Sequence, residues 1–288
     1  MEAPVGSRHH RRRRDHEPLL RRWTRAALKR GARRVAPAPA DHRRALLVFG
    51  CQRSGTTMLQ QSLLDCSWRV ITLKEHDRRL VRASDPERVR WDSLDLVSSR
   101  MMALPFELIV AKPLVESHRV RDLLDTFEGA KGIWMLRHYL MVARSNLRRF
   151  GADNGYRDLR FLVESGPADW RGTATQEVRD RVAALLASGL SPLDAAAVFW
   201  WARNRLYIDQ ELWDDDRVRV LRYEVMLKFP EESLEALSEF VGLRLPLSAM
   251  KRRIHPAAAA HDGLRPDVEE LCSVLLAELE NVPDLLRR

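Results

Sequence analysis

The densest group of residues able to bind an anion is the run Gly50-Cys51-Gln52-Arg53-Ser54-Gly55-Thr56-Thr57. An apolar segment, Ala45–Phe49, precedes this run, and an amphipathic segment follows it from about Thr56. Backbone N–H groups converge where a strand passes into the N-terminus of a helix, and the helix dipole is positive there. Two glycines allow a tight turn, while an arginine and two threonines add a cation and hydroxyl donors. The run therefore predicts a loop that binds phosphate or sulfate groups.

Such a loop needs a strand before it and further strands beside it. Four more apolar runs are too short for helices and predict strands, at Val70–Leu73, Leu108–Ala111, Ile133–Leu136 and Val218–Leu221. Helical periodicity lies between them, and a long helix is predicted from about Pro192 to Trp213. Residues 151–191 are polar and rich in glycine, which predicts loops around one short helix. Alternating strands and helices predict an α/β fold with helices on both faces of a mainly parallel sheet.

The spacing of Gly50 and Gly55 is that of a Walker A loop, G-x-x-x-x-G-K-[ST], which binds nucleotide phosphates. Thr56 stands where that motif has its lysine, and Arg53 supplies a cation within the loop instead. An enzyme that uses a magnesium nucleotide normally keeps the lysine. A P-loop kinase or NTPase with a degenerate Walker loop is therefore the second hypothesis, and a non-catalytic anion-binding scaffold is the third.

The first hypothesis comes from a family resemblance. The stretch LLVFGCQRSGTTMLQQSLLD resembles the 5′-phosphosulfate loop of sulfotransferases that use 3′-phosphoadenosine 5′-phosphosulfate (PAPS), above all the carbohydrate and protein-tyrosine sulfotransferases. The resemblance implies a P-loop-type three-layer α/β/α fold and transfer of a sulfuryl group to an acceptor hydroxyl, with no metal ion. It also implies that five residues of the loop contact the donor: Arg53, Ser54, Gly55, Thr56 and Thr57. Of these, Arg53 would also take part in catalysis.

The family binds the 3′-phosphate of the donor with an arginine at a strand end and a serine eight residues later. The stretch WMLRHYLMVARS offers Arg137 and Ser145 at that spacing, after the fourth predicted strand. A guanidinium and a hydroxyl together hold a phosphate dianion better than either group alone. His138-Tyr139 replaces the Asp-Pro of the family. The resemblance thus implies that Arg137 and Ser145 bind the 3′-phosphate.

In the family members closest to this pattern, a glutamate just after the second strand activates the acceptor hydroxyl. Glu75 lies 22 residues after Arg53, and the resemblance implies that it is this base. A carboxylate can take the proton of an attacking hydroxyl. His76 is the alternative base. Lys112 resembles the lysine of the K-T-P segment of the family, although Pro113 follows it directly. The resemblance gives Lys112 the role of stabilising charge near the transferring sulfuryl group.

Later in the chain, VLRYEVMLKFPEESLEALSEFVGL resembles a segment whose tyrosine, here Tyr223, lies near the adenine of the donor. The stretch Lys251-Arg252-Arg253 stands where the family has a loop over the cofactor. Trp200 and Trp201 are expected in the core, with the donor pocket as the alternative for one of them. The resemblance covers about Leu46–Leu243.

The net charge of +9 belongs to the start of the chain. Residues 1–44 hold 14 basic and 4 acidic residues, and the remainder has a net charge of −1. We therefore predict a basic N-terminal arm over 1–44, flexible or partly helical, and a single domain over 45–288. No base-reading motif accompanies the arm, so no nucleic-acid partner is expected. Weak contact with an anionic membrane surface through an apolar stripe that includes Leu19 and Trp23 is the alternative role.

Three widely spaced cysteines exclude a disulfide framework and are typical of a reducing compartment. The longest apolar run, Ala195–Ala202, is shorter than the roughly 18 residues that a membrane span needs. No apolar segment typical of a secretion signal follows the basic N-terminus. We predict a cytoplasmic enzyme whose acceptor is a small molecule or glycan, with a carbohydrate or glycolipid hydroxyl first and a phenolic hydroxyl as the alternative. The sequence does not indicate the oligomeric state.

Overall fold

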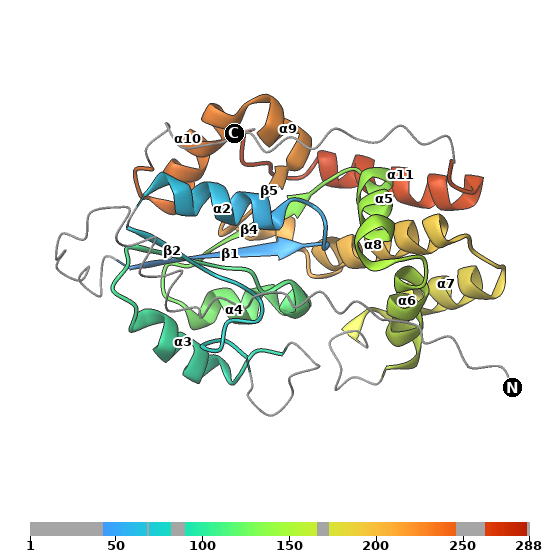
Figure 1. Ribbon diagram of the computed structural model, residues 1–288, viewed down its shortest axis with the longest axis horizontal. Helices are drawn as coiled ribbons and strands as arrows, with labels where there is room; N and C mark the ends of the chain where they lie inside the picture. The colour runs from blue at the N-terminus through green and yellow to red at the C-terminus, as the bar shows by residue number, and fades with distance from the viewer. Residues whose placement is uncertain (1–42, 68, 82–89, 166–172, 246–262, 287–288) are drawn as a thin grey trace, which may run out of the picture. The chain divides into compact units, whose positions relative to one another are not determined.

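Five short apolar segments form a parallel sheet in the computed structural model (Figure 1). The strands are β1 (Arg44–Gly50), β2 (Val70–Leu73), β3 (Leu108–Ala111), β4 (Lys131–Leu136) and β5 (Val218–Arg222). Their order across the sheet is β2-β3-β1-β4-β5, and every pair of neighbours is parallel. All five predicted strands are confirmed.

The structure describes residues 43–67, 69–81, 90–165, 173–245 and 263–286. The basic arm, apart from its last two residues, and the stretch Lys251-Arg252-Arg253 lie outside these ranges. The arm over 1–44 and the single domain over 45–288 therefore stay predictions. None of the described helices is both long and apolar enough to cross a bilayer.

Each strand is followed in the chain by one or more helices. They are α2 (Thr56–Cys66), α3 (Leu94–Met102), α4 (Val120–Thr126), α5 (Tyr139–Phe150), α6 (Asn154–Glu164), α7 (Gln176–Ala187), α8 (Pro192–Asp209), α9 (Tyr223–Lys228), α10 (Pro230–Val241) and α11 (Pro266–Glu280). Two short 3₁₀ turns, η2 (Leu114–Glu116) and η4 (Leu212–Asp214), complete the described elements.

Alternation along β1 divides the core into two layers. Leu46 and Val48 face one hydrophobic cluster, which α2, α9 and α10 cover. Leu47 and Phe49 face the other, to which α3, α4, α5 and α8 contribute. Because side chains of a strand point alternately to opposite faces, this apolar run buries both sides of the sheet. Figure 1 shows α2, α9 and α10 on one side of the sheet and α3 and α4 on the other. The predicted three-layer α/β/α architecture is confirmed.

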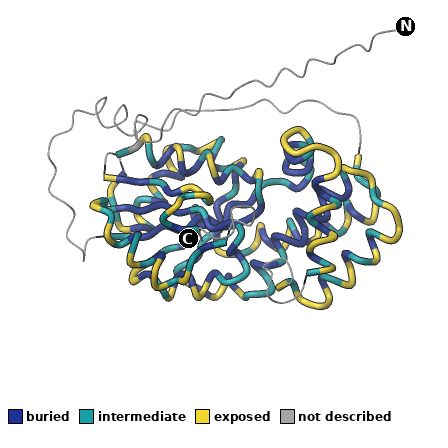
Figure 2. Tube along the Cα trace, turned by 60° about the horizontal axis from the view of Figure 1, so that its bottom comes forward, coloured by how far each residue is buried: buried dark blue, intermediate teal, exposed yellow. Residues whose placement is uncertain are grey.

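A group of helices made by α5 to α8 and α11 continues beyond the carboxyl end of β1 (Figure 1). Its centre is α8, whose residues are mostly buried, and the buried trace in Figure 2 runs from the strands into this group. Trp134 of β4 packs edge-on against Tyr207 of α8, with ring centroids 5.5 Å apart. The indole Nε1 of Trp134 donates to Oδ1 of Asn204 at 2.9 Å. These contacts attach the helical group to the sheet.

The prediction of loops over 151–191 is wrong, because this region forms α6 and α7. Two of the glycines that suggested loops, Gly151 and Gly155, serve the helices. Gly151 ends α5 with a φ of 89°. Gly155 lies in the first turn of α6, where a Cβ atom would come within 2.7 Å of the backbone nitrogen of Ala196 in α8. The prediction for α8 was also slightly long, since Glu211 adopts a left-handed φ of 53° just after the helix ends.

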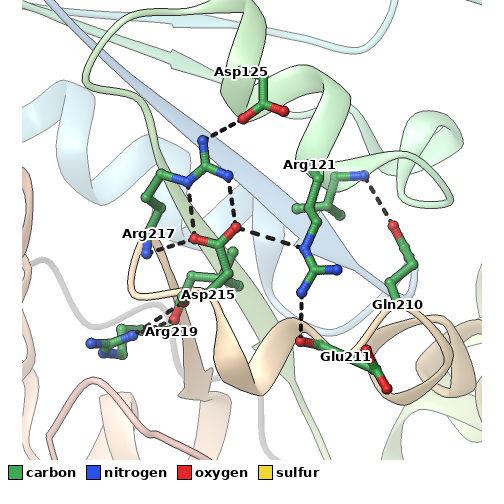
Figure 3. A network of polar contacts seen from close by, with 9 residues as sticks. Arg121, Asp125, Gln210, Glu211, Asp215, Arg217 and Arg219 are labelled. Carbon is green, nitrogen blue, oxygen red and sulfur yellow. Dashed lines mark hydrogen bonds and ion pairs between the residues drawn. The ribbon is translucent and has the colours of Figure 1, made fainter.

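A network of ion pairs lies before β5, at the edge of the sheet opposite the carboxyl ends of the strands (Figure 3). Arg217 binds both carboxylate oxygens of Asp215 through Nε and Nη2, at 2.9 and 2.8 Å, and its Nη1 donates to Asp125 of α4 at 2.6 Å. Arg121 of α4 donates to the carbonyl of Glu211 at 2.9 Å. The network therefore joins α4 to the segment between α8 and β5.

Candidate active site

The loop predicted to bind an anion connects the central strand β1 to α2. Gly50 and Gly55 both have left-handed φ values, 114° and 93°. A Cβ atom on Gly50 would lie 2.6 Å from the carbonyl oxygen of Met135, and one on Gly55 would lie 2.3 Å from the ring of Tyr223. Glycine is required at both positions by backbone conformation and by close packing. These two glycines therefore set the shape of the loop.

The start of α2 is open to an anion. Its N-cap residue, Gly55, has no side chain to cap the first turn, so the N–H groups there keep their donor capacity. Thr57 is exposed, whereas Ser54 and Thr56 are buried. The hydroxyl of Ser54 has no hydrogen-bond partner within the described part of the chain. The start of α2 thus offers backbone donors and one unused hydroxyl.

Arg53 has a left-handed φ of 71°, which is uncommon for a residue other than glycine. Strained backbone of this kind concentrates at functional sites. The side chain of Arg53 donates from Nε to the hydroxyl of Ser145 on α5, at 3.1 Å. Its carbonyl accepts from Nη1 of Arg137, also at 3.1 Å. The structure thus brings together three of the predicted donor-binding residues, from the loop, the exit of β4 and α5.

Tyr223 completes this side of the site. The guanidinium of Arg137 lies over its ring, 4.3 Å from the centroid, in a cation–π arrangement. The same ring packs against Gly55 of the loop. This contact follows from the sheet order, because β1, β4 and β5 are neighbours and the residues after their carboxyl ends meet at one edge. The predicted adenine-binding tyrosine therefore lies beside the loop and the predicted phosphate-binding arginine.

Two arginines that the sequence did not single out belong to the same cluster. Burial and then the charges of Arg149, Arg137 and Arg148 lower the pKa of Arg53. None of these four guanidiniums forms an ion pair with a described carboxylate. Like charges without acidic partners repel one another, and a bound multivalent anion would relieve that repulsion. Arg148 and Arg149 follow Ser145 by three and four residues on α5, the spacing that places side chains on one helix face, so this spacing was available as a signal.

A second cluster lies on the other side of the loop. The Nζ atom of Lys112, just after β3, is 3.5 Å from Oε2 of Glu75, which follows β2. The same Nζ donates to the hydroxyl of Thr57 at 3.2 Å. The side chains of Lys112 and Glu75 are 13% and 20% exposed, so water reaches both. The amide of Gln60 on α2 donates to the carbonyl of Leu73 at 3.0 Å, which fixes the end of β2. His76 is exposed.

The anion-binding loop lies between two clusters of polar side chains. On one side, guanidiniums and hydroxyls can hold a second anion, and on the other, a carboxylate and an ammonium can take up a proton and stabilise negative charge. Cys51 lies in the loop but is fully buried. Burial raises the pKa of its thiol to about 12, so it stays protonated and is no nucleophile. Among the described side chains, no group of His, Cys, Asp and Glu is arranged to hold a metal ion.

No protein-family model matches the sequence, and no curated protein sequence matches it. Solved structures with a similar fold include the sulfotransferase domain of the Synechococcus PCC 7002 olefin synthase, with 15% identity, 81% of this chain and 94% of that one covered, and a TM-score of 0.47. A sulfotransferase from Alicyclobacillus acidocaldarius has 17% identity, coverages of 82% and 93%, and a TM-score of 0.44. Sulfotransferase STF9 from Mycobacterium avium has 15% identity, coverages of 93% and 83%, and a TM-score of 0.46.

Likenesses of this size carry no argument about substrate or mechanism. All three of these proteins are sulfotransferases.

Proposed function

We propose that this protein transfers a sulfuryl group from PAPS to an acceptor hydroxyl of a carbohydrate, a glycolipid or another small molecule. One observation carries the proposal: the predicted 3′-phosphate residues, Arg137 and Ser145, both hydrogen-bond to Arg53 of the phosphate loop. Two anion sites therefore adjoin each other at one edge of the sheet. A nucleotide with a charged group at both its 5′ and 3′ positions suits this pair of sites.

The groups present suit such a donor. The hydroxyl of Ser54 and Nε of Arg137 are buried polar atoms without a partner in the described ranges, and a bound anion would supply acceptors to both. Arg53 and the three arginines around it, Arg137, Arg148 and Arg149, provide positive charge that no described carboxylate balances. Tyr223 adds an aromatic face beside them. In the proposal, the loop N–H groups and Arg53 hold the 5′ end, while Arg137, Ser145, Arg148 and Arg149 hold the 3′-phosphate.

The catalytic roles follow from the second cluster. PAPS supplies an activated sulfuryl group, which an acceptor oxygen attacks while the S–O bond to the phosphate breaks. Glu75 takes the proton of the acceptor hydroxyl as the new S–O bond forms. Lys112 and Arg53 stabilise the negative charge that develops on the bridging oxygen of the leaving phosphate. Removing one such preorganised donor typically lowers the rate by about 10²–10³.

The test is transfer itself. The full chain is incubated with PAPS and a mixed library of carbohydrate, glycolipid and phenolic acceptors, and products are identified by a mass gain of one sulfo group. A parallel reaction receives ATP and Mg²⁺ instead. We expect products only with PAPS. Products only with ATP and Mg²⁺ would select the P-loop kinase hypothesis, and donor binding without any product would favour the non-catalytic scaffold.

Donor binding has its own readout in 3′-phosphoadenosine 5′-phosphate (PAP), the product that the donor leaves. A ligand that binds only the folded state stabilises it by about 2.7 kcal/mol at 100 times its Kd. We expect PAP to raise the Tm accordingly. No thermal shift at millimolar PAP would contradict the proposed donor.

A further inference from the structure

One peptide bond at the exit of β4 is held entirely by side chains. The carbonyl oxygen of Arg137 accepts a hydrogen bond from the indole Nε1 of Trp200, at 2.9 Å. The N–H of His138, the other polar group of the same peptide bond, donates to Oε1 of Glu224 at 3.3 Å. Trp200 belongs to α8 and Glu224 to α9. Two helices distant in sequence thus hold the single peptide unit between Arg137 and His138.

The peptide unit between Arg137 and His138 takes no part in the hydrogen bonds of β4 or α5. The strand β4 ends at Leu136, and α5 begins at Tyr139. In the first turn of α5, the N–H groups of Met141 and Val142 donate to the carbonyl of His138 and not to that of Arg137, and the N–H of Leu140 donates to Nδ1 of His138. A peptide group that belongs to neither a ladder nor a helix needs other partners. Trp200 is fully buried and supplies one of them.

Holding this peptide unit restrains the ψ angle of Arg137 and so steadies the backbone from which its side chain extends. With the peptide held as it is, the guanidinium reaches the carbonyl of Arg53 and lies over the ring of Tyr223. Glu224 directly follows Tyr223 in the chain. The first two residues of α9 therefore hold Arg137 from two sides, one through its guanidinium and the other through the peptide bond that follows it.

We propose that Trp200 and Glu224 are positioning residues that direct Arg137 toward the phosphate loop and so determine recognition of a 3′-phosphate. The inference rests on the proposed function, because it concerns the proposed donor. Its readout is binding, measured as the ratio of the Kd for adenosine 5′-phosphate to the Kd for PAP. The two ligands differ only in the 3′-phosphate, so this ratio isolates the contribution of that group.

Trp200→Phe keeps an aromatic ring and removes the indole N–H. We expect the ratio, measured by isothermal titration calorimetry, to fall about tenfold, the effect of one lost hydrogen bond at a buried group. Trp134→Phe is the matched control. Trp134 is equally buried and also donates one indole hydrogen bond of 2.9 Å, but to Asn204 and not to the exit of β4. This control should keep the ratio of the wild type.

Glu224 gives a second, independent pair of variants. Its side chain is exposed, so substitution leaves the core intact. Glu224→Gln retains a side-chain oxygen that can accept from the His138 N–H, whereas Glu224→Met has a similar length and no such oxygen. We expect the ratio of the two Kd values to fall in Glu224→Met and to stay at the wild-type value in Glu224→Gln.

Three results would overturn the inference. One is a wild-type ratio in both Trp200→Phe and Glu224→Met. Another is an equal loss in Trp200→Phe and Trp134→Phe, and the third is an equal loss in Glu224→Gln and Glu224→Met. Failure of the proposed function looks different, because then the wild type itself would bind PAP no more tightly than adenosine 5′-phosphate.

Discussion

Replacing Glu75 by glutamine tests the proposed base with little change in shape. Oε2 of Glu75 is 3.5 Å from Nζ of Lys112. The amide of glutamine still offers an oxygen to this ammonium, but it cannot take up a proton at neutral pH. The substitution therefore separates the role of Glu75 as a base from its role as a partner of Lys112.

The expected effects differ greatly in size. General-base catalysis contributes about 10²–10⁴ to a rate, which corresponds to about 2.7–5.5 kcal/mol of activation free energy. A partly exposed ion pair contributes only about 0–1 kcal/mol to folding. We therefore expect kcat to fall by at least two orders of magnitude while the free energy of unfolding hardly changes. The affinity for PAP should not fall, because Glu75 contacts the lysine and not the arginine cluster.

The assay is single-turnover sulfo transfer from PAPS, followed by mass spectrometry, with PAP affinity measured on the same preparation. Glu107→Gln is the matched control, since Glu107 also forms an ion pair, with Arg69, but lies before β3 at the opposite edge of the sheet. Turnover of Glu75→Gln within tenfold of the wild type would refute the assignment. If His76→Ala then abolished turnover, His76 would be the base.

Three further outcomes are expected. Arg137→Ala should weaken the binding of PAP by about 10-fold to 100-fold, because charged hydrogen bonds are lost, and should barely change the binding of adenosine 5′-phosphosulfate. If calorimetry showed equal weakening for both ligands, Arg137 would not belong to the 3′-phosphate site. Gly55→Ala should lower the free energy of unfolding by at least about 1–2 kcal/mol in urea titrations and reduce the affinity for PAP, because the added Cβ would meet the Tyr223 ring. The control is Gly129→Ala, which should show only the backbone cost, because Gly129 also has a left-handed φ, 68°, but nothing lies within 4 Å of an added Cβ. Identical behaviour of the two variants would contradict the packing argument. Asp215→Asn should lower the Tm at pH 7 with no change in kcat per folded molecule. Hydrogen bonds from Arg217 hold the pKa of Asp215 below its usual value, so the stability it adds is present above about pH 4 and is lost as the pH falls through the folded pKa; a Tm difference that stays constant down to pH 2 would count against this.

Most of the strands could be predicted from the sequence because they are short apolar runs that are buried on both faces of the sheet, whereas β5 includes the half-buried Arg219 and Arg222. Val70–Leu73 and Leu108–Ala111 are β-branched or apolar throughout and match β2 and β3 in full. The helices α6 and α7 were not predicted because the region around them is polar and rich in glycine, although only α6 contains a glycine, Gly155. Gly155 is small so that α6 can approach α8, a tertiary contact that local composition does not reveal.

The site residues were expected from the family resemblance, but their contacts depend on the order of the strands. Arg53 meets Arg137 because β1 and β4 are neighbours, although 84 residues separate them. The hydrogen bond of the Trp200 indole was beyond prediction for the same reason, since it joins residues 63 positions apart.

The central claim is that one nucleotide is held at both ends, by the phosphate loop and by the exit of β4. A crystal structure of the full chain with PAP tests it most directly. We expect the 5′-phosphate at the N–H groups between Arg53 and Thr57, and the 3′-phosphate within hydrogen-bonding distance of Arg137 and Ser145. A 3′-phosphate that points into solvent, or PAP bound on another face of the sheet, would contradict the account.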